Sequence, residues 1–301
     1  KQSMYLVFDI GGTFVKYAKI TLDGEIVYKS KIPTNNKEGL DVFIETLVAV
    51  YKQHQEGIKG IAVSTPGAVD VENGIIYNGG NLPFLHESHF RDLLSSRCDG
   101  LPVAVENDGK CAGLAEAWIG AAKDVQDAIV LAFGTGIAGA VIKDKKIHRG
   151  NRLVAGEVSF LINEMDRSKK PIIWAHQNSA LLLGQLAERA KNLPVGSVDG
   201  EQFFEMVKAN DEDCLEILAD FCYKIAVQTY NLTLIFDPDI ICIGGGISEQ
   251  PRLIDEIKKQ IDIIWEDMPH IAKPNIAKCA FNNDSNLLGA LYNFMQVYHL
   301  I

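Results

Sequence analysis

In YLVFDIGGT, residues 5–13, an apolar run ends in an aspartate and a glycine turn follows. A phosphate-binding P-loop would need a Gly-Lys-Ser/Thr ending and a helix after it. Residues 14–20, FVKYAKI, instead have the β-branched and aromatic composition of a strand. The stretch therefore predicts a β-hairpin, and the alternative is an ordinary turn with no ligand. In the functional interpretation, Gly11, Gly12 and Thr13 offer donors to an anion, and Asp9 holds a hydrated Mg²⁺ beside phosphates.

The same pattern returns in the second half of the chain. Residues 128–133 and 137–142 predict two strands, and Gly134, Thr135 and Gly136 form the turn between them. Two such turns in equivalent positions favour a clamp on a polyphosphate held between two similar halves. A third glycine run follows a strand predicted at 240–243 and precedes a helix predicted at 251–264. The run comprises Gly244, Gly245 and Gly246. A glycine run before a helix is suited to binding a nucleotide, and the alternative is a flexible connection between strand and helix.

The tripeptide Glu106-Asn107-Asp108 lies between a predicted strand, 102–105, and a predicted helix, 110–119. Asn and Asp are preferred helix N-caps, which is the purely structural interpretation. Capping needs only one of them, however, and α/β proteins place their chemistry at strand ends. We therefore predict that Asp108 is a general base that accepts a proton from an attacking hydroxyl. The N-terminus of the helix would favour its ionised form.

Polar, turn-prone segments supply further candidates. A sugar site needs several neutral and acidic hydrogen-bond partners, because each hydroxyl both donates and accepts. Simple loops are the alternative interpretation for each segment taken alone. The side chains that would provide this mixture are Asn81, Asn107, Asp108 and Glu157.

Composition narrows the class of protein. The 301 residues carry a formal net charge of −10, with no Lys/Arg cluster, which argues against nucleic acid as a partner. No apolar run approaches the roughly 18–20 residues that a membrane span needs. The six cysteines are scattered without CxC or CxxC spacing, so we expect buried thiols in a reducing, cytoplasmic compartment. Residues 1–3, ahead of Met4, are interpreted as an expression remnant.

In this order, the motifs resemble those of the ROK family (repressors, uncharacterised frames and sugar kinases). The resemblance runs from Asp9 to the C-terminal helix and implies an α/β, actin-like (RNase H-like, duplicated) two-lobed ATPase fold. The implied lobes are residues 4–119, joined by the helix 286–301, and residues 120–285. The resemblance also implies ATP and Mg²⁺ as cofactors, a homodimer, and Asp108 as the catalytic base. The positions that it assigns to the sugar are Gly67, Asn81, Asn107 and Glu157.

The chain departs from the family at one point. Many members bind structural zinc through a Gly-Glu-x-Gly-His segment and a following cysteine cluster. Here Phe160 stands at the histidine position, and no cysteine lies between Phe160 and Leu183. We therefore expect no zinc site. In zinc-binding members of the family, that histidine and a glutamate of the cysteine cluster contact the sugar near its anomeric end. Because this chain lacks both, we expect a looser hold on the C1 hydroxyl and room for a β-glucoside.

The resulting hypothesis is ATP-dependent phosphorylation of the 6-hydroxyl of a hexose, either glucose or the glucosyl unit of a β-glucoside. Kinases for fructose, mannose, allose or N-acetylmannosamine are alternatives within the same class. A non-enzymatic sugar sensor is a further alternative, as is a phosphotransferase for acyl or polyphosphate acceptors. The residues around Asp108, with Asn81 and Glu157, favour a polyol acceptor.

Overall fold

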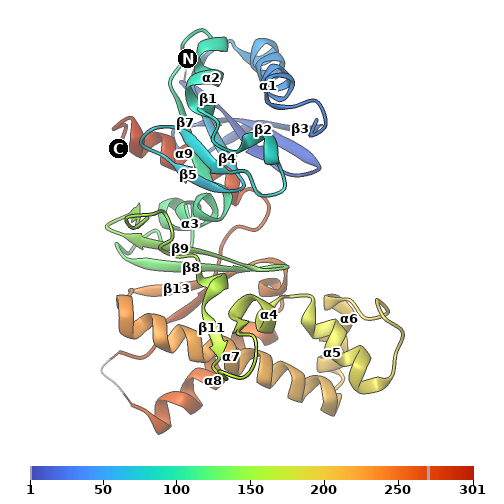
Figure 1. The fold of residues 1–301 in the computed structure, drawn as a ribbon. Coiled ribbons are helices and arrows are strands. Elements are labelled where there is room, and N and C mark those ends of the chain that lie inside the picture. The colour runs from blue at the N-terminus through green and yellow to red at the C-terminus, as the bar shows by residue number, and fades with distance from the viewer. Residues whose placement is uncertain (1, 270–271) are drawn as a thin grey trace. The chain divides into compact units, whose positions relative to one another are not determined.

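The computed structural model describes residues 2–269 and 272–301 (Figure 1). Contacts divide them into two compact units. The first contains the described residues up to Lys123, together with Arg149–Ala155 and Asn283–Ile301. The second contains Asp124–His148 and the described part of Gly156–Asn282. In the described parts of the chain, no helix has the length and apolar character that would let it cross a membrane.

The sheet of the first unit has five strands in the order β3-β2-β1-β4-β7. The three strands β3, β2 and β1 are antiparallel neighbours, whereas β1, β4 and β7 run parallel. The predicted hairpin across the first glycine turn is confirmed by the pairing of β1 with β2. The strands are β1 (Met4–Ile10), β2 (Phe14–Thr21), β3 (Ile26–Pro33), β4 (Ile58–Thr65) and β7 (Val103–Asn107).

Four α-helices of the first unit cover this sheet: α1 (Leu40–His54), α2 (Phe90–Arg97), α3 (Asp108–Ile119) and α9 (Ser285–Val297). Helix α1 buries Phe43, Ile44 and Leu47, whose spacing of three to four residues places them on one face. A small hairpin, β5 (Ala68–Asp70) and β6 (Ile75–Asn78), and a 3₁₀ turn, η1 (Pro83–Leu85), complete the unit.

Helices α3 and α9 approach each other closely. A Cβ atom on Gly289 of α9 would lie 1.6 Å from the carbonyl oxygen of Cys111 in α3, so only glycine fits there. The rings of Trp118 and Tyr292 stack at 5.5 Å, and the Tyr298 hydroxyl donates to the Val103 carbonyl at 2.7 Å. These contacts hold α9 and the residue that follows it against α3 and the start of β7.

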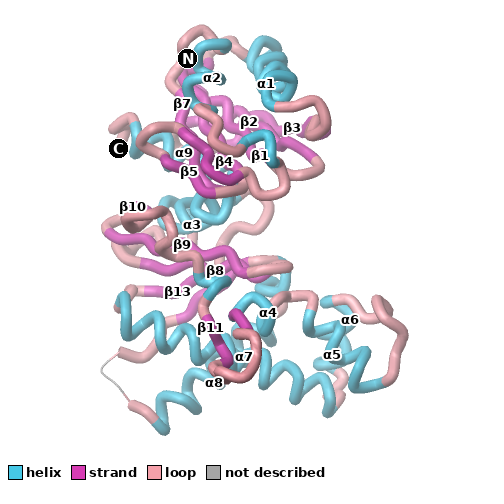
Figure 2. The backbone as a smooth tube through the Cα atoms, in the orientation of Figure 1, coloured by secondary structure: helices cyan, strands magenta, loops and turns pink. Residues whose placement is uncertain are grey.

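The sheet of the second unit repeats the plan of the first in the order β10-β9-β8-β13-β14. Here β10, β9 and β8 are antiparallel neighbours, and β8, β13 and β14 run parallel. Figure 2 shows β9, β8 and β13 as strands of this sheet. The duplication expected from the sequence is therefore present in the strand order itself. The strands are β8 (Ala128–Phe133), β9 (Ile137–Lys143), β10 (Lys146–Ile147), β13 (Ile240–Gly244) and β14 (Ile276–Lys278).

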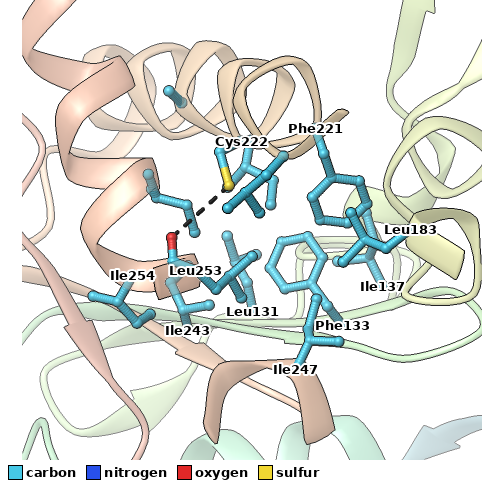
Figure 3. Close-up of a cluster of buried hydrophobic side chains, with 14 of the residues drawn as sticks. Leu131, Phe133, Ile137, Leu183, Phe221, Cys222, Ile243, Ile247, Leu253 and Ile254 are labelled. Atoms are coloured by element: carbon cyan, nitrogen blue, oxygen red, sulfur yellow. Dashed lines mark hydrogen bonds between the residues drawn. The ribbon is translucent and has the colours of Figure 1, made fainter. Parts of the chain in front are cut away.

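The α-helices in the described part of the second unit are α4 (Trp174–Asn178), α5 (Leu182–Lys191), α6 (Gly200–Lys208), α7 (Glu212–Phe236) and α8 (Pro251–Asp267). Smaller elements are η2 (Val158–Phe160), β11 (Ile162–Glu164), β12 (Ile172–Ile173) and η3 (Gly246–Glu249). Figure 3 shows how the core joins sheet to helices, with Leu131, Phe133 and Ile243 facing Phe221, Leu253 and Leu183.

A break separates α4, which ends at Asn178, from α5, which begins at Leu182. The buried Asn178 accounts for the break, because its side chain accepts from Trp174 Nε1 at 2.6 Å and donates to the Phe221 carbonyl at 2.9 Å. Ser179 then adopts an extended backbone with ψ of 133°. Because Phe221 lies 43 positions from Asn178, helical spacing alone could not reveal this contact.

Candidate active site

The first glycine turn joins β1 to β2 in the first unit. The Gly11 amide donates to the Phe14 carbonyl at 3.0 Å, and a Cβ on Gly11 would lie 2.7 Å from that oxygen. Thr34 fastens the turn, because its amide donates to the Thr13 carbonyl and its hydroxyl donates to the Gly11 carbonyl. Gly12 and Thr13 are exposed, and a Cβ on Gly12 would meet nothing within 4 Å. A ligand can therefore approach the backbone at Gly12.

Asp9 lies one residue before the end of β1, and its partners are mostly neutral. Asn286 of α9 donates to both carboxylate oxygens, at 3.3 and 3.4 Å. Burial raises the pKa of Asp9, whereas the Ser64 hydroxyl, the Asn286 amide and the charge of Lys16 lower it. Mg²⁺ in phosphate sites is commonly held by one or two carboxylates, waters and the phosphates themselves. A single carboxylate held by neutral donors beside a glycine turn fits that pattern.

The strand β7 ends in the tripeptide that the sequence singled out. Asn107 is the N-cap of α3, since its Oδ1 accepts from the Lys110 amide at 3.2 Å. Asp108 is therefore not the capping residue, and its Oδ1 accepts from the Gly109 amide at 2.7 Å. The carboxylate of Asp108 lies in the first turn of α3, where the helix dipole favours its negative charge.

Glu106 is fully buried and is held by a cation that the sequence did not indicate. Arg149, from the segment after β10, donates to one carboxylate oxygen, and the Asn107 amide donates to the other at 2.7 Å. Burial raises the pKa of Glu106, and Arg149, the Asn107 amide and Lys110 act in the opposite direction. Glu106 is thus a structural support that fixes the strand end from which Asn107 and Asp108 project.

Two of the predicted sugar positions touch each other. Asn107 Nδ2 donates to the Gly67 carbonyl at 2.7 Å. Gly67 has φ of +98°, and a Cβ there would lie 1.3 Å from the Asn78 carbonyl oxygen, so the loop after β4 packs directly on the end of β6. Asn81 follows three residues after Asn78 and is exposed.

The second glycine turn joins β8 to β9 in the second unit. The Gly134 amide donates to the Gly136 carbonyl at 2.9 Å, and the Ala180 amide donates to the Gly134 carbonyl at 2.8 Å. Thr135 is exposed. The Ser159 hydroxyl accepts from the Ile137 amide and donates to its carbonyl, which fixes η2 beside the exit of the turn. Glu157 directly precedes η2 and is exposed.

The third glycine run follows β13 and packs against the end of β8. Gly245 has φ of +90°, and a Cβ there would lie 2.1 Å from the Phe133 carbonyl oxygen. The Ser248 amide and hydroxyl both donate to the Gly245 carbonyl. The run therefore enters η3 first, and α8 begins only at Pro251.

A pocket of about 550 Å³ within the second unit brings two of these segments together. Gly134 and Thr135 line it from one glycine turn, and Gly246 lines it from the third run. Its volume lies in the range typical of ligand sites, roughly 300–1,000 Å³. The remaining lining residues, which the sequence analysis did not name, are Phe133, Ala180, Leu181, Gly200, Glu201, Phe204, Ile247 and Gln250.

The predicted residues thus divide by unit. Those in the first unit are Asp9, Gly11, Gly12, Thr13, Gly67, Asn81, Asn107 and Asp108, and those in the second are Gly134, Thr135, Gly136, Glu157, Gly244, Gly245 and Gly246. The sequence missed Arg149, Asn286 and Glu201, because each acts on a partner or pocket from a distant segment. In the ranges 2–269 and 272–301, no group of three or more His, Cys, Asp or Glu side chains is arranged to hold a metal ion.

Comparison with known proteins assigns the family. Residues 5–169 and 182–297 match the profile of the ROK family. A β-glucoside kinase of Listeria monocytogenes serovar 1/2a is 32% identical over 291 residues, covering 96% of each chain. A β-glucoside kinase of Klebsiella pneumoniae is 32% identical over 297 residues, covering 97% of this chain and 96% of the relative.

A solved structure agrees with these relatives. A ROK family protein from Streptococcus pneumoniae TIGR4, in complex with sucrose, superposes with a TM-score of 0.88 and 30% identity, covering 99% of this chain and 100% of the other. The actin-like, duplicated α/β fold expected from the sequence is confirmed by such neighbours and by the two matching sheets. The resemblance inferred from the motifs is also confirmed: this chain belongs to the ROK family.

Proposed function

We propose that the chain is an ATP-dependent kinase that phosphorylates the 6-hydroxyl of glucose or of the glucosyl unit of a β-glucoside. The observation that carries the proposal is the similarity to two β-glucoside kinases over nearly the whole chain. The local geometry supports it, because a carboxylate begins α3 at the end of a parallel strand and glycine turns head both sheets.

Asp108 is the general base of the proposed reaction. It accepts the proton of the 6-hydroxyl as that oxygen attacks the γ-phosphorus of ATP and ADP leaves. Asn107 makes the capping bond of α3, which leaves the role of Asp108 to chemistry, and the helix N-terminus favours the ionised carboxylate that a base requires.

Backbone amides hold the phosphates in this proposal. The exposed turns around Gly12 and Thr135 offer N–H donors without side chains that would block an anion. Asp9 would hold Mg²⁺ through water, and the ion would neutralise charge on the phosphates. Gly244, Gly245 and Gly246 support the nucleotide from the end of β13.

The sugar is held by a mixture of amide, carbonyl and carboxylate groups. Asn107 and the Gly67 carbonyl are already joined by a hydrogen bond, so they present a fixed arrangement to a hydroxyl. Asn81 and Glu157 are exposed and add an amide and a carboxylate. Such partners suit a polyol, whose hydroxyls both donate and accept.

Phe160 supports a substrate that is substituted at C1. Phe160 is 68% exposed and ends η2, and its amide donates to the carbonyl of Glu157, the residue before this short turn, at 3.3 Å. An exposed ring beside Glu157 offers an apolar surface to a second sugar ring. The sucrose bound by the similar pneumococcal protein is likewise a glucose substituted at C1.

The substitution Asp108→Asn tests the catalytic role. We expect kcat to fall by about 10²- to 10⁴-fold, because the amide cannot take the proton. Sugar affinity measured by calorimetry and the melting temperature should remain close to those of the wild type. Near-normal turnover in a coupled ADP-release assay would refute the assignment.

Comparing free glucose with cellobiose tests the substrate class. We expect kcat/KM for cellobiose to equal or exceed that for glucose. Phe160→Ala should raise KM for cellobiose by about 5- to 20-fold, because burying one side of an aromatic ring is worth about 1–2 kcal/mol. KM for glucose should stay within about 2-fold in this variant. An exclusive preference for free glucose in the wild type would exclude a β-glucoside as the substrate.

A further inference from the structure

The residues that line the pocket of the second unit are of two chemical kinds. Gly134, Thr135 and Gly246 offer backbone amides, which suit phosphates. Gly200 and Glu201, at the start of α6, add a carboxylate. Because a carboxylate repels a phosphate at close range, we expect the phosphates to bind beside the glycines and away from the α6 side of the pocket, where Glu201 lies.

A second pocket, of about 760 Å³, adjoins the first at the same residue. Glu201 lines both pockets, and the second is also lined by the acidic Asp199 and Glu205. The surroundings of Glu201 are therefore acidic, which further disfavours an anion there. In the nucleotide, the neutral group far from the phosphates is the base, so the base belongs on the α6 side.

Glu201 is not needed to form its own helix. Asp199 caps α6, accepting from the Gln202 amide at 2.8 Å, and the Gln202 side chain accepts from the Asp199 amide in return. In the part of the chain that the structure describes, the Glu201 carboxylate has no hydrogen-bond or ion-pair partner. Glu201 lies in the first turn of α6, where the N-terminal end of the helix dipole is positive.

We infer that Glu201 selects the nucleobase, accepting a hydrogen bond from the 6-amino group of adenine and rejecting bases with a 6-oxo group. An ionised carboxylate can only accept, and the 6-oxo group of hypoxanthine or guanine is also an acceptor. The apolar side chains of Leu181, Phe204 and Ile247 line the same pocket and provide surface for the ring. The inference rests on the proposed function and adds to it the choice of ATP as phosphoryl donor.

Binding of ADP and IDP, which differ at position 6 of the base, tests the inference without requiring turnover. In the wild type we expect calorimetry to show ADP binding about 10- to 100-fold tighter than IDP, the usual range for a hydrogen bond to a charged group. Glu201→Gln should reduce this ratio to about 3-fold or less, because the amide can also donate to a 6-oxo group. The ratio of kcat/KM for ATP and ITP should change in parallel.

Glu205→Gln is the matched control, since Glu205 lies one helical turn later and lines only the neighbouring pocket. This variant should keep the wild-type ratio of ADP to IDP affinity. An unchanged ratio in Glu201→Gln, or an equal loss of both nucleotides, would overturn the inference while leaving a sugar kinase in place. Failure of the wild type to bind any nucleotide would overturn the proposed function as well.

Discussion

The two sheets share one strand order, but the rows of residues beside their glycine turns differ sharply. In the first unit, the row across β2, β1, β4 and β7 reads Lys16, Asp9, Ser64 and Glu106, each paired with the next in register. Three of these four side chains are ionisable. This sheet therefore concentrates charge at the strand ends where Asn107 and Asp108 follow.

The equivalent row of the second unit is small and neutral. Ala138 pairs with Ala132, and Ala132 pairs with Gly244, at the positions that correspond to Lys16, Asp9 and Ser64. A Cβ on Gly244 would lie 2.9 Å from the Cys279 sulfur, so the row continues without a charge. The same strand order thus carries two different rows: one sheet has ionisable side chains there, and the other has small neutral residues beside the turn after β8, whose Gly134 and Thr135 line a pocket.

Glu106 in the charged row is paired with the cation Arg149, and removing that cation should have the largest effect of the changes considered. Arg149→Met leaves the buried Glu106 carboxylate without its cation, which we expect to lower the free energy of unfolding by about 3 kcal/mol at pH 8. Loss of Arg149 moves the pKa of Glu106 still further above its ordinary value of 4.5. The folded state then keeps a proton that the unfolded state has released, so stability should fall as pH rises above about 5.

Urea titration of this variant at pH 5 and pH 8 checks both statements. The loss in free energy of unfolding relative to the wild type should be smaller at pH 5, because a protonated Glu106 needs no cation. Arg152→Met, in the same segment but at an exposed position, should stay within about 0.5 kcal/mol of the wild type. A deficit that is equal at both pH values would show that Arg149 acts through packing instead.

Placing a charge in the neutral row should have the next largest effect. Ala132→Asp copies Asp9 into the second unit, where Ala138 and Gly244 leave space beside it. Like charges about 5 Å apart repel by about 3 kcal/mol near a protein surface. After screening by salt, we expect ADP to bind about 30-fold more weakly. The control Ala132→Ser should change ADP affinity by less than about 2-fold. Equal ADP affinity in Ala132→Asp and Ala132→Ser would show that the turn between β8 and β9 does not face phosphates.

Much of the fold could be predicted from the sequence, because it depends on local signals. Alternating and apolar runs around Gly11 and Gly134 predicted both hairpins, and the strand-to-helix junction at Asn107 lies where the pattern placed it. The resemblance of the ordered motifs to a known family supplied the duplicated fold. A distant partner also marks the break between α4 and α5, where Asn178 donates to the Phe221 carbonyl.

The supports of the site could not be predicted, because they join segments far apart in sequence. Arg149 lies 43 positions from Glu106, and Asn286 lies 277 positions from Asp9. No periodicity links such pairs. Glu201 stands in an ordinary helix start, S-V-D-G-E-Q, where only the pocket gives its side chain a role. The sequence therefore indicated the candidate reactive groups, whereas the residues that contact and support them could be identified only from the structure.

The smallest expected effect compares the glycines of the two turns. A Cβ on Gly12 or Gly134 would meet nothing within 4 Å, and neither has the positive φ that favours glycine, so neither glycine is needed to fold its turn. Gly12→Ala and Gly134→Ala should each change stability by less than about 1 kcal/mol. Each substitution should nevertheless lower kcat/KM for ATP by about 5- to 10-fold. The reason is that the added methyl group stands where a phosphate approaches the backbone, which costs about 1 kcal/mol.

Gly245→Ala provides the contrast, because its φ of +90° and the Phe133 carbonyl at 2.1 Å from the added Cβ make glycine structurally necessary. That variant should lose stability first and activity as a consequence. Melting temperatures and ATP kinetics measured on all three separate a glycine kept for the ligand from one kept for the fold. If Gly12→Ala and Gly134→Ala both retained full activity, the turns would be ordinary hairpins, and if only one lost activity, the two sheets would not share phosphate binding.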